Sequence, residues 1–439
     1  MEFSADFIKR IENDFPNDYG KLLSSLNNDP VISIRHNPKK VGHLTLDDKI
    51  PWTVHGEYLD ERPAYAQDPS FHAGAYYPQE ASSMALEPVL RFIDEQIPIN
   101  RILDLCASPG GKSTHILSLI PSEAVLLSNE IVPKRFTVLN ENLIKWGYPN
   151  FMTSNYHPKQ IARLEDVFDV VVVDAPCSGE GLFRKQPKWR SQWTESNCEL
   201  CANRQKDILA QADKLLRPGG YLIYSTCTLN PSENVETIAH ANEQFNWNSI
   251  SIPELLKYNF QEVHQKEAVG YMALPHLVRG EPFFISCLKK AGDAQPLMAR
   301  TSRILYEDGG LDASITRSKT LFQKKNEDYY DLNAAQVELA EHAEFAKLRL
   351  QLPSLGSFKG KSFIPTHFAA MHINSPLQAH HIDTNKENAL AYLRHENLQM
   401  DGFEKGWYML VYKQVNLGWV KYDGRRWINK YPMKWRLRK

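Results

Sequence analysis

The sequence predicts an α/β protein built on a doubly wound, mostly parallel sheet with helices on both faces. One observation is the stretch 101–113, R-I-L-D-L-C-A-S-P-G-G-K-S, which is typical of a buried strand, a glycine turn and the start of a helix. The other is the alternation of apolar, strand-like runs with helical patterns as far as residue 288. Glycines let the backbone approach a ligand and a helix N-terminus offers unpaired N–H groups, so we expect a ligand at the carboxyl ends of these strands.

Length and composition limit the class of protein. The 439 residues are enough for two or three domains. A formal net charge of −1 confines any nucleic-acid surface to a local basic patch. The six cysteines are too few for a disulfide framework, and the chain shows neither a signal-peptide pattern nor an apolar run of about 20 residues. We therefore expect a cytoplasmic protein that does not insert into membranes.

Residues 1–95 predict a small α+β domain. Apolar residues recur there at helical spacing and predict an amphipathic first helix: Phe3, Phe7, Ile8, Ile11 and Phe15. Residues 31–35 alternate like a short strand, and the Pro-, Tyr- and charge-rich stretch 51–71 predicts irregular structure. A helix through Leu86 and Leu90 follows the segment Y-Y-P-Q-E-A-S-S-M.

Residues 96–292 predict the sheet domain. The predicted strands are 101–106, 124–128, 168–173, 221–225 and 283–288. The predicted helices run to about Ile120, from about Phe136 to Leu143, and over 199–216, where Arg-Pro-Gly-Gly ends the last one.

The remainder predicts a linker and intermediate domain over 293–375 and a β-rich basic domain over 376–439. A composition shift at 291–300 marks the boundary, a helix is predicted at 333–350 and a loop at 353–360. Residues 405–439 hold ten Lys or Arg against one acid, Asp423, with four tryptophans interleaved. Such a surface suits RNA, because charge follows phosphates and rings stack on bases. The alternative is a small domain with an aromatic core and a solvated basic face.

Three strand ends carry candidate site residues. Glu130 closes the second strand, where an acid can accept hydrogen bonds from both hydroxyls of a ribose. The strand at 168–173 leads into D-A-P-C-S-G-E-G, with Asp174 and Cys177, and the strand at 221–225 leads into S-T-C-T, with Cys227. If these strands are neighbours, both cysteines face the same crevice.

Two other interpretations start from single motifs. Gly-Lys-Ser at 111–113 and V-V-V-V-D at 170–174 suggest a P-loop NTPase that handles RNA, but Cys106 stands where the first P-loop glycine belongs. Cys198-x-x-Cys201 suggests zinc, but no second pair accompanies it and it falls in a predicted helix, so we expect no metal site.

Three motifs occur in the order found in one known family: D-L-C-A-S-P-G-G-K-S, D-A-P-C-S-G-E-G and Y-S-T-C-T-L-N-P-S-E-N. Through them the sequence resembles the Sun-type RNA (cytosine-5) methyltransferases over about 70–290. Y-Y-P-Q-E-A-S-S-M and P-F-F-I-S-C-L-K-K belong to the same resemblance. S-I-R-H-N and G-W-V-K-Y-D-G-R-R extend it toward bacterial members that act on 16S ribosomal RNA. The resemblance implies a Rossmann-like core that uses S-adenosylmethionine, and an appended PUA-like RNA-binding domain. It implies 16S ribosomal RNA or the small ribosomal subunit as partner, with transfer RNA as the alternative, and a monomer.

The resemblance also assigns roles to residues. It implies that a continuous loop wraps the amino-acid part of the cofactor: Cys106, Ala107, Ser108, Pro109, Gly110, Gly111 and Lys112. It makes Glu130 the ribose acid and places Asp174 beside the cofactor and the target base. Asn155 stands where the family has an acid near the adenine, and Lys185 matches a basic motif that lines the site.

The chemistry explains why such a site needs cysteine. C5 of cytosine is a poor nucleophile until a thiolate adds at C6 and pushes electron density to C5. Spacing does not decide which cysteine attacks. A Pro-Cys nucleophile, as in DNA cytosine methyltransferases, would be Cys177, whereas the RNA family implies Cys227 as nucleophile with Cys177 assisting release. The presence of both argues against a non-catalytic RNA-binding module.

Overall fold

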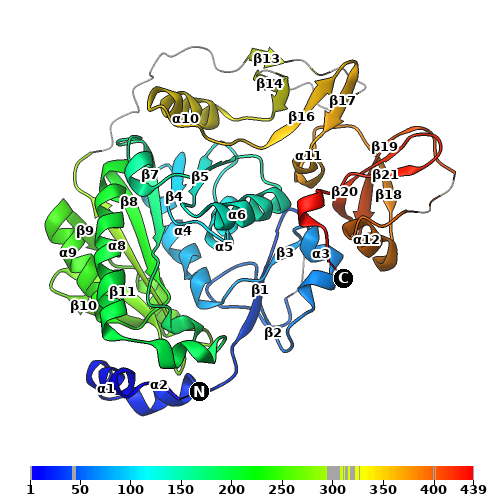
Figure 1. The fold of residues 1–439 in the computed structure, drawn as a ribbon. Coiled ribbons are helices and arrows are strands. Elements are labelled where there is room, and N and C mark those ends of the chain that lie inside the picture. The colour runs from blue at the N-terminus through cyan, green and yellow to red at the C-terminus, as the bar shows by residue number, and fades with distance from the viewer. Residues whose placement is uncertain are drawn as a thin grey trace.

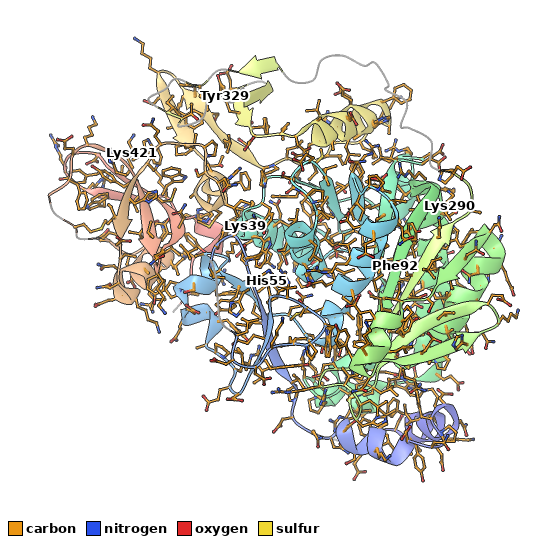
Figure 2. The ribbon with its side chains drawn as sticks, turned by 180° about the vertical axis from the view of Figure 1, so that it is seen from behind. Lys39, His55, Phe92, Lys290, Tyr329 and Lys421 are labelled. Carbon is orange, nitrogen blue, oxygen red and sulfur yellow. The ribbon has the colours of Figure 1, made fainter. Side chains whose placement is uncertain are left out.

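The computed structural model describes residues 2–41, 46–293, 327–398, 400 and 402–438, with short stretches at 307–309, 311, 315–316 and 322–325. A central sheet domain lies between α1 and α2 at one end and the C-terminal strands β18–β21 on the other side, with β13–β17 along a third side (Figure 1). Figure 2 places Lys421 of the C-terminal sheet and Lys290 of the central sheet on opposite sides of the molecule. Most of the predicted boundary at 291–300 lies outside the described residues.

The central sheet of the described residues has nine strands in the order β10-β11-β12-β8-β7-β4-β5-β6, with β9 beside β12. Five strands pair in parallel: β4 (Arg101–Asp104), β5 (Val125–Asn129), β6 (Phe151–Ser154), β7 (Phe168–Asp174) and β8 (Leu216–Thr226). Four others pair antiparallel: β9 (Trp247–Ile250), β10 (Gln261–Gln265), β11 (Ala268–Ala273) and β12 (Phe283–Lys290). The predictions of β4, β5, β7, β8 and β12 are confirmed. The sequence pattern missed β6, β9, β10 and β11, of which β10 is polar and partly exposed.

Helices cover both faces of this sheet, as predicted. One face packs against α4 (Leu86–Gln96), α5 (Gly111–Leu119) and α6 (Pro133–Trp146). The other packs against α7 (Pro158–Ile161), α8 (Glu195–Leu215), α9 (Val235–Phe245) and α10 (Ala334–Phe345). Alternate residues of β4 enter the two cores, Ile102 on one side and Leu103 on the other, which explains why the central strands are apolar throughout. The predicted helices at α4, α5, α6, α8 and α10 are confirmed.

The N-terminal region combines helices with a small sheet. Its elements are α1 (Ala5–Asp14), α2 (Tyr19–Ser25), β1 (Ile32–His36), β2 (Gly56–Leu59), α3 (Pro69–His72) and β3 (Tyr76–Tyr77), with strand order β2-β1-β3. The first helix and the strand near 31–35 are confirmed. The expectation of irregular structure over 51–71 is wrong in part, because β2 and α3 lie there. Each is four residues long, too short for its hydrophobic period to register.

The C-terminal part holds two further sheets. One has the order β13-β14-β15-β16-β17: β13 (Glu307–Gly309), β14 (Phe322–Lys325), β15 (Asp328–Tyr330), β16 (Ser354–Lys359) and β17 (Ser362–Pro365). After α11 (His367–Met371), the other comprises β18 (His380–Asp383), β19 (Gly406–Tyr412), β20 (Val415–Tyr422) and β21 (Trp427–Asn429), with α12 (Lys386–Leu393). The predicted loop at 353–360 is wrong: Ser354–Lys359 form β16, which pairs with β15 and β17 despite Gly356 within it.

The aromatic residues of the last segment are divided between core and surface. Trp419 and Tyr431 are each 2% exposed and belong to the core, whereas Trp407, Trp427 and Trp435 are half-buried. The segment therefore has an aromatic core and also leaves rings at its surface, while RNA contact by that surface stays a prediction. The predicted domain limits at 95, 292 and 375 stay predictions. Within the described residues, no helix is long and apolar enough to cross a membrane.

Polar contacts attach the N-terminal region to α6. The Lys40 ammonium donates to the carbonyl oxygens of Ala73 and Lys145 at 2.8 and 2.6 Å, and burial lowers the pKa of Lys40 to about 7. The Asn37 amide donates to the carbonyl oxygen of Trp146 at 2.9 Å. The bonds to Lys145 and Trp146 satisfy carbonyl groups at the end of α6 that have no partner within the helix.

Arg35 of β1 attaches the same region to the glycine turn. Its guanidinium is buried and donates to Gln79 Oε1 at 2.8 Å and to Thr114 Oγ1 at 2.7 Å. It also lies 4.4 Å from the centroid of the Trp146 ring. Burial lowers the pKa of Arg35 to about 9, which leaves it charged at neutral pH. A cation from the N-terminal sheet thereby holds the first turn of α5.

Replacing Arg35 should destabilise the whole chain. In Arg35→Met the methionine keeps an apolar side chain of similar reach but leaves the buried Gln79 and Thr114 oxygens without their donor. We expect this to lower the free energy of unfolding by about 3 kcal/mol. We expect the melting temperature to fall by several degrees in a thermal unfolding scan. Arg62→Met is the matched control, because Arg62 is exposed and lies 5.8 Å from the Tyr65 ring. Equal melting temperatures for the two variants would contradict this role for Arg35.

Candidate active site

Contacts with residues of β5 and α6 fix the backbone of the glycine turn after β4. Gly110 has φ +110°, and a Cβ there would lie 3.3 Å from Leu139 of α6. The Ala107 N–H donates to the Asn129 carbonyl oxygen at 2.9 Å, and the Asn142 amide donates to the Pro109 carbonyl oxygen at 2.8 Å. The turn is therefore fixed on β5 and α6 before any ligand binds.

Asp104, the last residue of β4, is a buried acid beneath this turn. Its Oδ2 accepts a hydrogen bond from Ser113 Oγ at 2.6 Å, while its buried Oδ1 has no protein partner. Burial, with the nearby Asp174 and Glu130 carboxylates, raises the pKa of Asp104 to about 7. An unpaired carboxylate oxygen at a cavity wall is suited to a cationic ligand group.

Glu130 follows β5 at the predicted place. Its side chain is 3% exposed; Oε1 accepts from the Val132 N–H at 2.8 Å, and Oε2 lies 3.5 Å from Arg135 Nε. Asn155, at the end of β6, is exposed, and its amide donates to the carbonyl oxygens of Glu130 and Ile131 at 2.5 and 3.0 Å. Asn155 thus supports the loop that carries Glu130, and it does not line a cavity there.

The two predicted cysteines meet. Because β7 and β8 pair in parallel, Cys177 and Cys227 follow neighbouring strand ends, and their sulfurs are 3.2 Å apart. The Cys227 N–H also points at Cys177 Sγ, at 3.4 Å. The hydrogen bond with Cys227 and burial raise the pKa of Cys177 well above the ordinary value. Both effects favour the protonated form of the Cys177 thiol.

Asp174 lies between the glycine turn and the cysteines. Its Oδ2 forms an ion pair with Lys112 Nζ at 2.8 Å, and its Oδ1 accepts from Ser225 Oγ at 2.9 Å. Lys112 also lies 5.1 Å from the centroid of the Phe283 ring. The carboxylate is thus held in one orientation while its side chain stays 38% exposed toward the cavities.

Two adjoining cavities contain most of the predicted site. The larger, about 820 Å³, is lined by Glu130, Asp174, Cys177 and Cys227 among others. The smaller, about 200 Å³, is lined by Asp104 and by the residues of the turn from Cys106 to Pro109, Gly111 and Lys112. Cys106, Ser108 and Asp174 line both cavities. Lys185 is exposed and lines neither cavity.

The structure adds residues that the sequence did not single out. Glu180 of the D-A-P-C-S-G-E-G motif is fully buried, and its Oε1 accepts from Arg10 at 2.7 Å and from Trp193 Nε1 at 2.8 Å. Its Oε2 accepts from the Leu229 N–H at 2.9 Å, two residues beyond Cys227. Glu180 therefore joins the loops after the two cysteines to α1. In the sequence, the only signal of this contact is the acid inside the motif, because its partner Arg10 is 170 residues away.

A second group lines the larger cavity from the side. It comprises Arg135 of α6, Lys159 of α7, Arg204 of α8, and Trp189 from the segment before α8. Trp189 also packs on Gly179, where an added Cβ would lie 3.1 Å from the ring. Cations and a ring beside a nucleophile suit a phosphate-linked, aromatic substrate.

Family models match three parts of the chain. Residues 92–289 match "16S rRNA methyltransferase RsmB/F", residues 3–81 match the N-terminal domain of 16S rRNA methyltransferase RsmF, and residues 379–437 match the RsmF PUA domain. These matches confirm the predicted methyltransferase core with an N-terminal domain and a PUA domain.

Individual proteins agree with these matches. The chain is 26% identical to ribosomal RNA small subunit methyltransferase F of Erwinia tasmaniensis over 98% of this chain and 96% of the relative. It is 29% identical to the Salmonella arizonae protein of the same name over 87% of this chain and 83% of the relative. A solved methyltransferase homologue from Pyrococcus horikoshii is similar in fold, with a TM-score of 0.55 at 24% identity, over 66% of this chain and 95% of that one.

Glu180→Gln should loosen the loop that carries Cys227. The NH2 group of the glutamine must face either the Leu229 N–H or the Arg10 and Trp193 donors. Buried donors then meet without an acceptor, which lowers the free energy of unfolding by about 1–3 kcal/mol. We expect faster hydrogen exchange at the Leu229 amide and faster alkylation of Cys227 by iodoacetamide. Glu195→Gln, at the exposed start of α8, is the control. If exchange and alkylation match the wild type, Glu180 does not position this loop.

Proposed function

The chain belongs to the 16S ribosomal RNA methyltransferase RsmB/F family, and on that premise we propose that it methylates C5 of a cytosine in 16S ribosomal RNA, using S-adenosylmethionine. The observation that carries the proposal is the pair of thiols 3.2 Å apart at neighbouring strand ends, beside Asp174 in one cavity. Membership of a methyltransferase family disfavours the alternative of a P-loop NTPase.

The chain's own groups fit the proposed cofactor. The smaller cavity is lined by Asp104, whose buried Oδ1 has no protein partner and would take the ammonium of the amino-acid part. Glu130 would take the ribose hydroxyls in the larger cavity. Asn155 does not replace the family's adenine-side acid directly, because its amide is occupied by backbone carbonyls. When bound, S-adenosylmethionine supplies an electrophilic methyl group.

The target cytosine must leave any stack to reach the thiols, which costs a few kcal/mol and least in loops. Arg135, Lys159 and Arg204 would neutralise phosphates at the cavity wall, and Trp189 offers a ring for the extruded base.

Cys227 is the nucleophile in this proposal. Its thiolate adds to C6 of the ring, while Asp174, in its protonated form, donates to N3 and so favours the electron shift that makes C5 nucleophilic. Once C5 carries the methyl group, a base removes the C5 proton, the C5–C6 double bond re-forms and the Cys227 thiolate leaves. Cys177, which keeps its proton, is placed 3.2 Å from Cys227 to assist that departure.

Location and assembly follow the same proposal. Two site thiols this close would oxidise readily outside a reducing compartment, so we propose a cytoplasmic enzyme. It works as a monomer, with the methyltransferase domain at 96–292 and RNA contacts from the domains at 1–95 and 376–439. Lys185, exposed outside both cavities, has no proposed role in the reaction.

The two cysteines should behave differently as alanine variants. We expect Cys177→Ala to accumulate a covalent enzyme–RNA adduct, because addition proceeds but release is slowed. Cys227→Ala should form none, because it lacks the nucleophile. The adduct is a band of reduced mobility on a denaturing gel after incubation with S-adenosylmethionine and 16S ribosomal RNA. Adduct from the Cys227 variant alone would reverse the assignment.

Cofactor affinity should depend on pH through Asp104. Its pKa of about 7 in the free protein means that it must lose a proton to bind a cationic group. Affinity should therefore fall as pH drops below about 7, by up to tenfold per pH unit, and stay level above it. Calorimetry with S-adenosylhomocysteine, which keeps the ammonium, measures this. Asp104→Asn should bind weakly at every pH, and a flat wild-type profile would exclude Asp104 as the ammonium partner.

Bisulfite sequencing of total RNA from cells with and without the gene tests the function as a whole. One 16S ribosomal RNA cytosine that loses its mark on deletion is the expected result. A mark lost from transfer RNA instead would keep the chemistry and change the substrate. Unchanged marks in both RNAs would contradict the proposal.

A further inference from the structure

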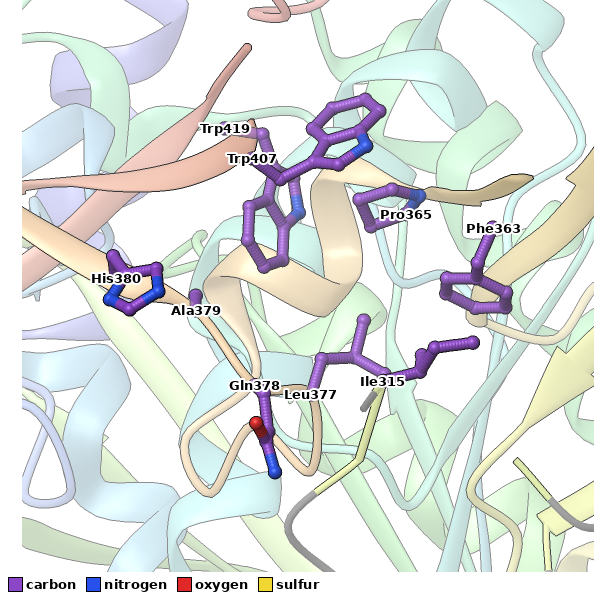
Figure 3. Close-up of a pocket in the computed structure, with 9 residues that line it drawn as sticks. All are labelled: Ile315, Phe363, Pro365, Leu377, Gln378, Ala379, His380, Trp407 and Trp419. Carbon is purple, nitrogen blue, oxygen red and sulfur yellow. The ribbon is translucent and has the colours of Figure 1, made fainter. Parts of the chain in front are cut away.

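A third cavity, of about 360 Å³, lies at the junction between the C-terminal sheet and β17, apart from the residues of the active site (Figure 3). We name it the junction pocket. Its walls include Trp407 of β19, Trp419 of β20, and Phe363 and Pro365 of β17. The two indoles lie together on one side, with Phe363 on another (Figure 3). Its volume falls in the range of about 300–1,000 Å³ that small-molecule sites occupy.

The walls of the junction pocket are fixed without an occupant. Trp419 is 2% exposed, and its indole N–H donates to the Thr366 carbonyl oxygen at 2.9 Å. Trp407 packs edge-to-face on Trp419, with ring centroids 6.3 Å apart. Phe363 packs edge-to-face on Phe358 and Tyr329, at 5.4 and 6.0 Å. A ligand would therefore meet a preformed aromatic surface, and little ordering would accompany binding.

Two cations lie over the half-buried ring of Trp407, and neither is among the residues that line the pocket itself. Lys421 Nζ is 5.3 Å and Lys430 Nζ is 5.4 Å from its centroid. Lys421 stands directly opposite Trp407 in the β19–β20 ladder, so the two side chains share one face of the sheet. In the described part of the chain, neither lysine forms an ion pair with a carboxylate. Aromatic walls with two unneutralised ammonium groups over one of their rings suit a flat ring that carries a phosphate.

We propose that the junction pocket binds one unstacked nucleotide of the RNA, its base against Trp407 and its phosphate at Lys421 and Lys430. The proposal rests on the RNA substrate proposed above. It goes beyond RNA binding by the basic domain, because one wall comes from β17 of the preceding segment. An apolar protein side chain is the weaker occupant, since it would leave both ammonium groups without a counter-charge.

The junction pocket lies outside the cavities that hold the two cysteines, so its contacts are the same before and during the chemical step. Such contacts bind ground state and transition state equally and act on KM rather than kcat. The nucleotide would thus help to dock the RNA without taking part in methyl transfer.

The test is fluorescence anisotropy with fluorescein-labelled, single-stranded oligouridine at several salt concentrations. Trp407→Ala and Phe363→Ala should each weaken binding by about tenfold, the loss expected for one base–aromatic stack, with no change in the salt slope. Lys421→Gln and Lys430→Gln should each lower the salt slope by about 0.7, the value for one phosphate of a single strand. Trp407→Phe should restore most of the affinity.

Lys413→Gln is the matched control, since Lys413 is exposed in the same domain, in the turn at the other end of the β19–β20 hairpin. It should bind oligouridine as the wild type does. Each variant is compared by thermal unfolding, and Phe363→Ala tests the pocket from the opposite wall if Trp407→Ala unfolds.

Wild-type affinity in both Trp407→Ala and Phe363→Ala would overturn the proposal. If those variants also lost methyl transfer only on assembled small subunits, the pocket would belong to a protein partner instead. Anisotropy measures RNA binding without methyl transfer. The experiment can therefore refute the nucleotide site without refuting the proposed function, and the reverse. An enzyme that shows this binding pattern but methylates no cytosine would refute the proposed function and leave the nucleotide site standing.

Discussion

The parallel pairing of β7 between β4 and β8 is the constraint on which the catalytic arrangement depends. In that register Asp174 lies opposite Ser225, so the chain segments after both strands leave the sheet at the same edge. Cys177 and Cys227, 50 residues apart, are brought to 3.2 Å by this pairing. The two cores that pack on both faces of the strands keep it in place, since a slip of one residue would exchange the side chains packed in each core.

Buried charges then connect the outer parts of the chain to that edge. Arg35 reaches from β1 to the first turn of α5, and Glu180 links Arg10 of α1 to the loop beyond Cys227. Removing one member of such a contact leaves the other buried without a partner, which is costly. The N-terminal region is therefore part of the active-site scaffold as well as a separate RNA-binding element in the proposed function.

Electrostatics divides the site into regions with different tasks. Lys112 neutralises Asp174, whereas Asp104 is left with a free oxygen and a raised pKa, ready for a cation. Cys177 keeps its proton because its neighbour is a second thiol in a buried place. At the far end of the chain, Lys421 and Lys430 stay unneutralised beside Trp407, where phosphates would supply the counter-charge.

The sequence by itself determined the central strands and helices, the glycine turn, Glu130, and the cysteines at two strand ends. Apolar periodicity and local motifs are properties of neighbouring residues, and those signals are strong where a strand is buried on both faces. It did not reveal β2 or β6, and it predicted a loop at 353–360 where β16 pairs with β15 on one side and, in a hairpin, with β17 on the other. Only the tertiary structure decided that Arg10 forms an ion pair with Glu180 and that the Asn155 amide donates to backbone carbonyls. It alone also decided that Phe363 and Trp407 line one pocket. These contacts join residues far apart in the chain, and their free energy exists only when packing brings both partners together and excludes water between them.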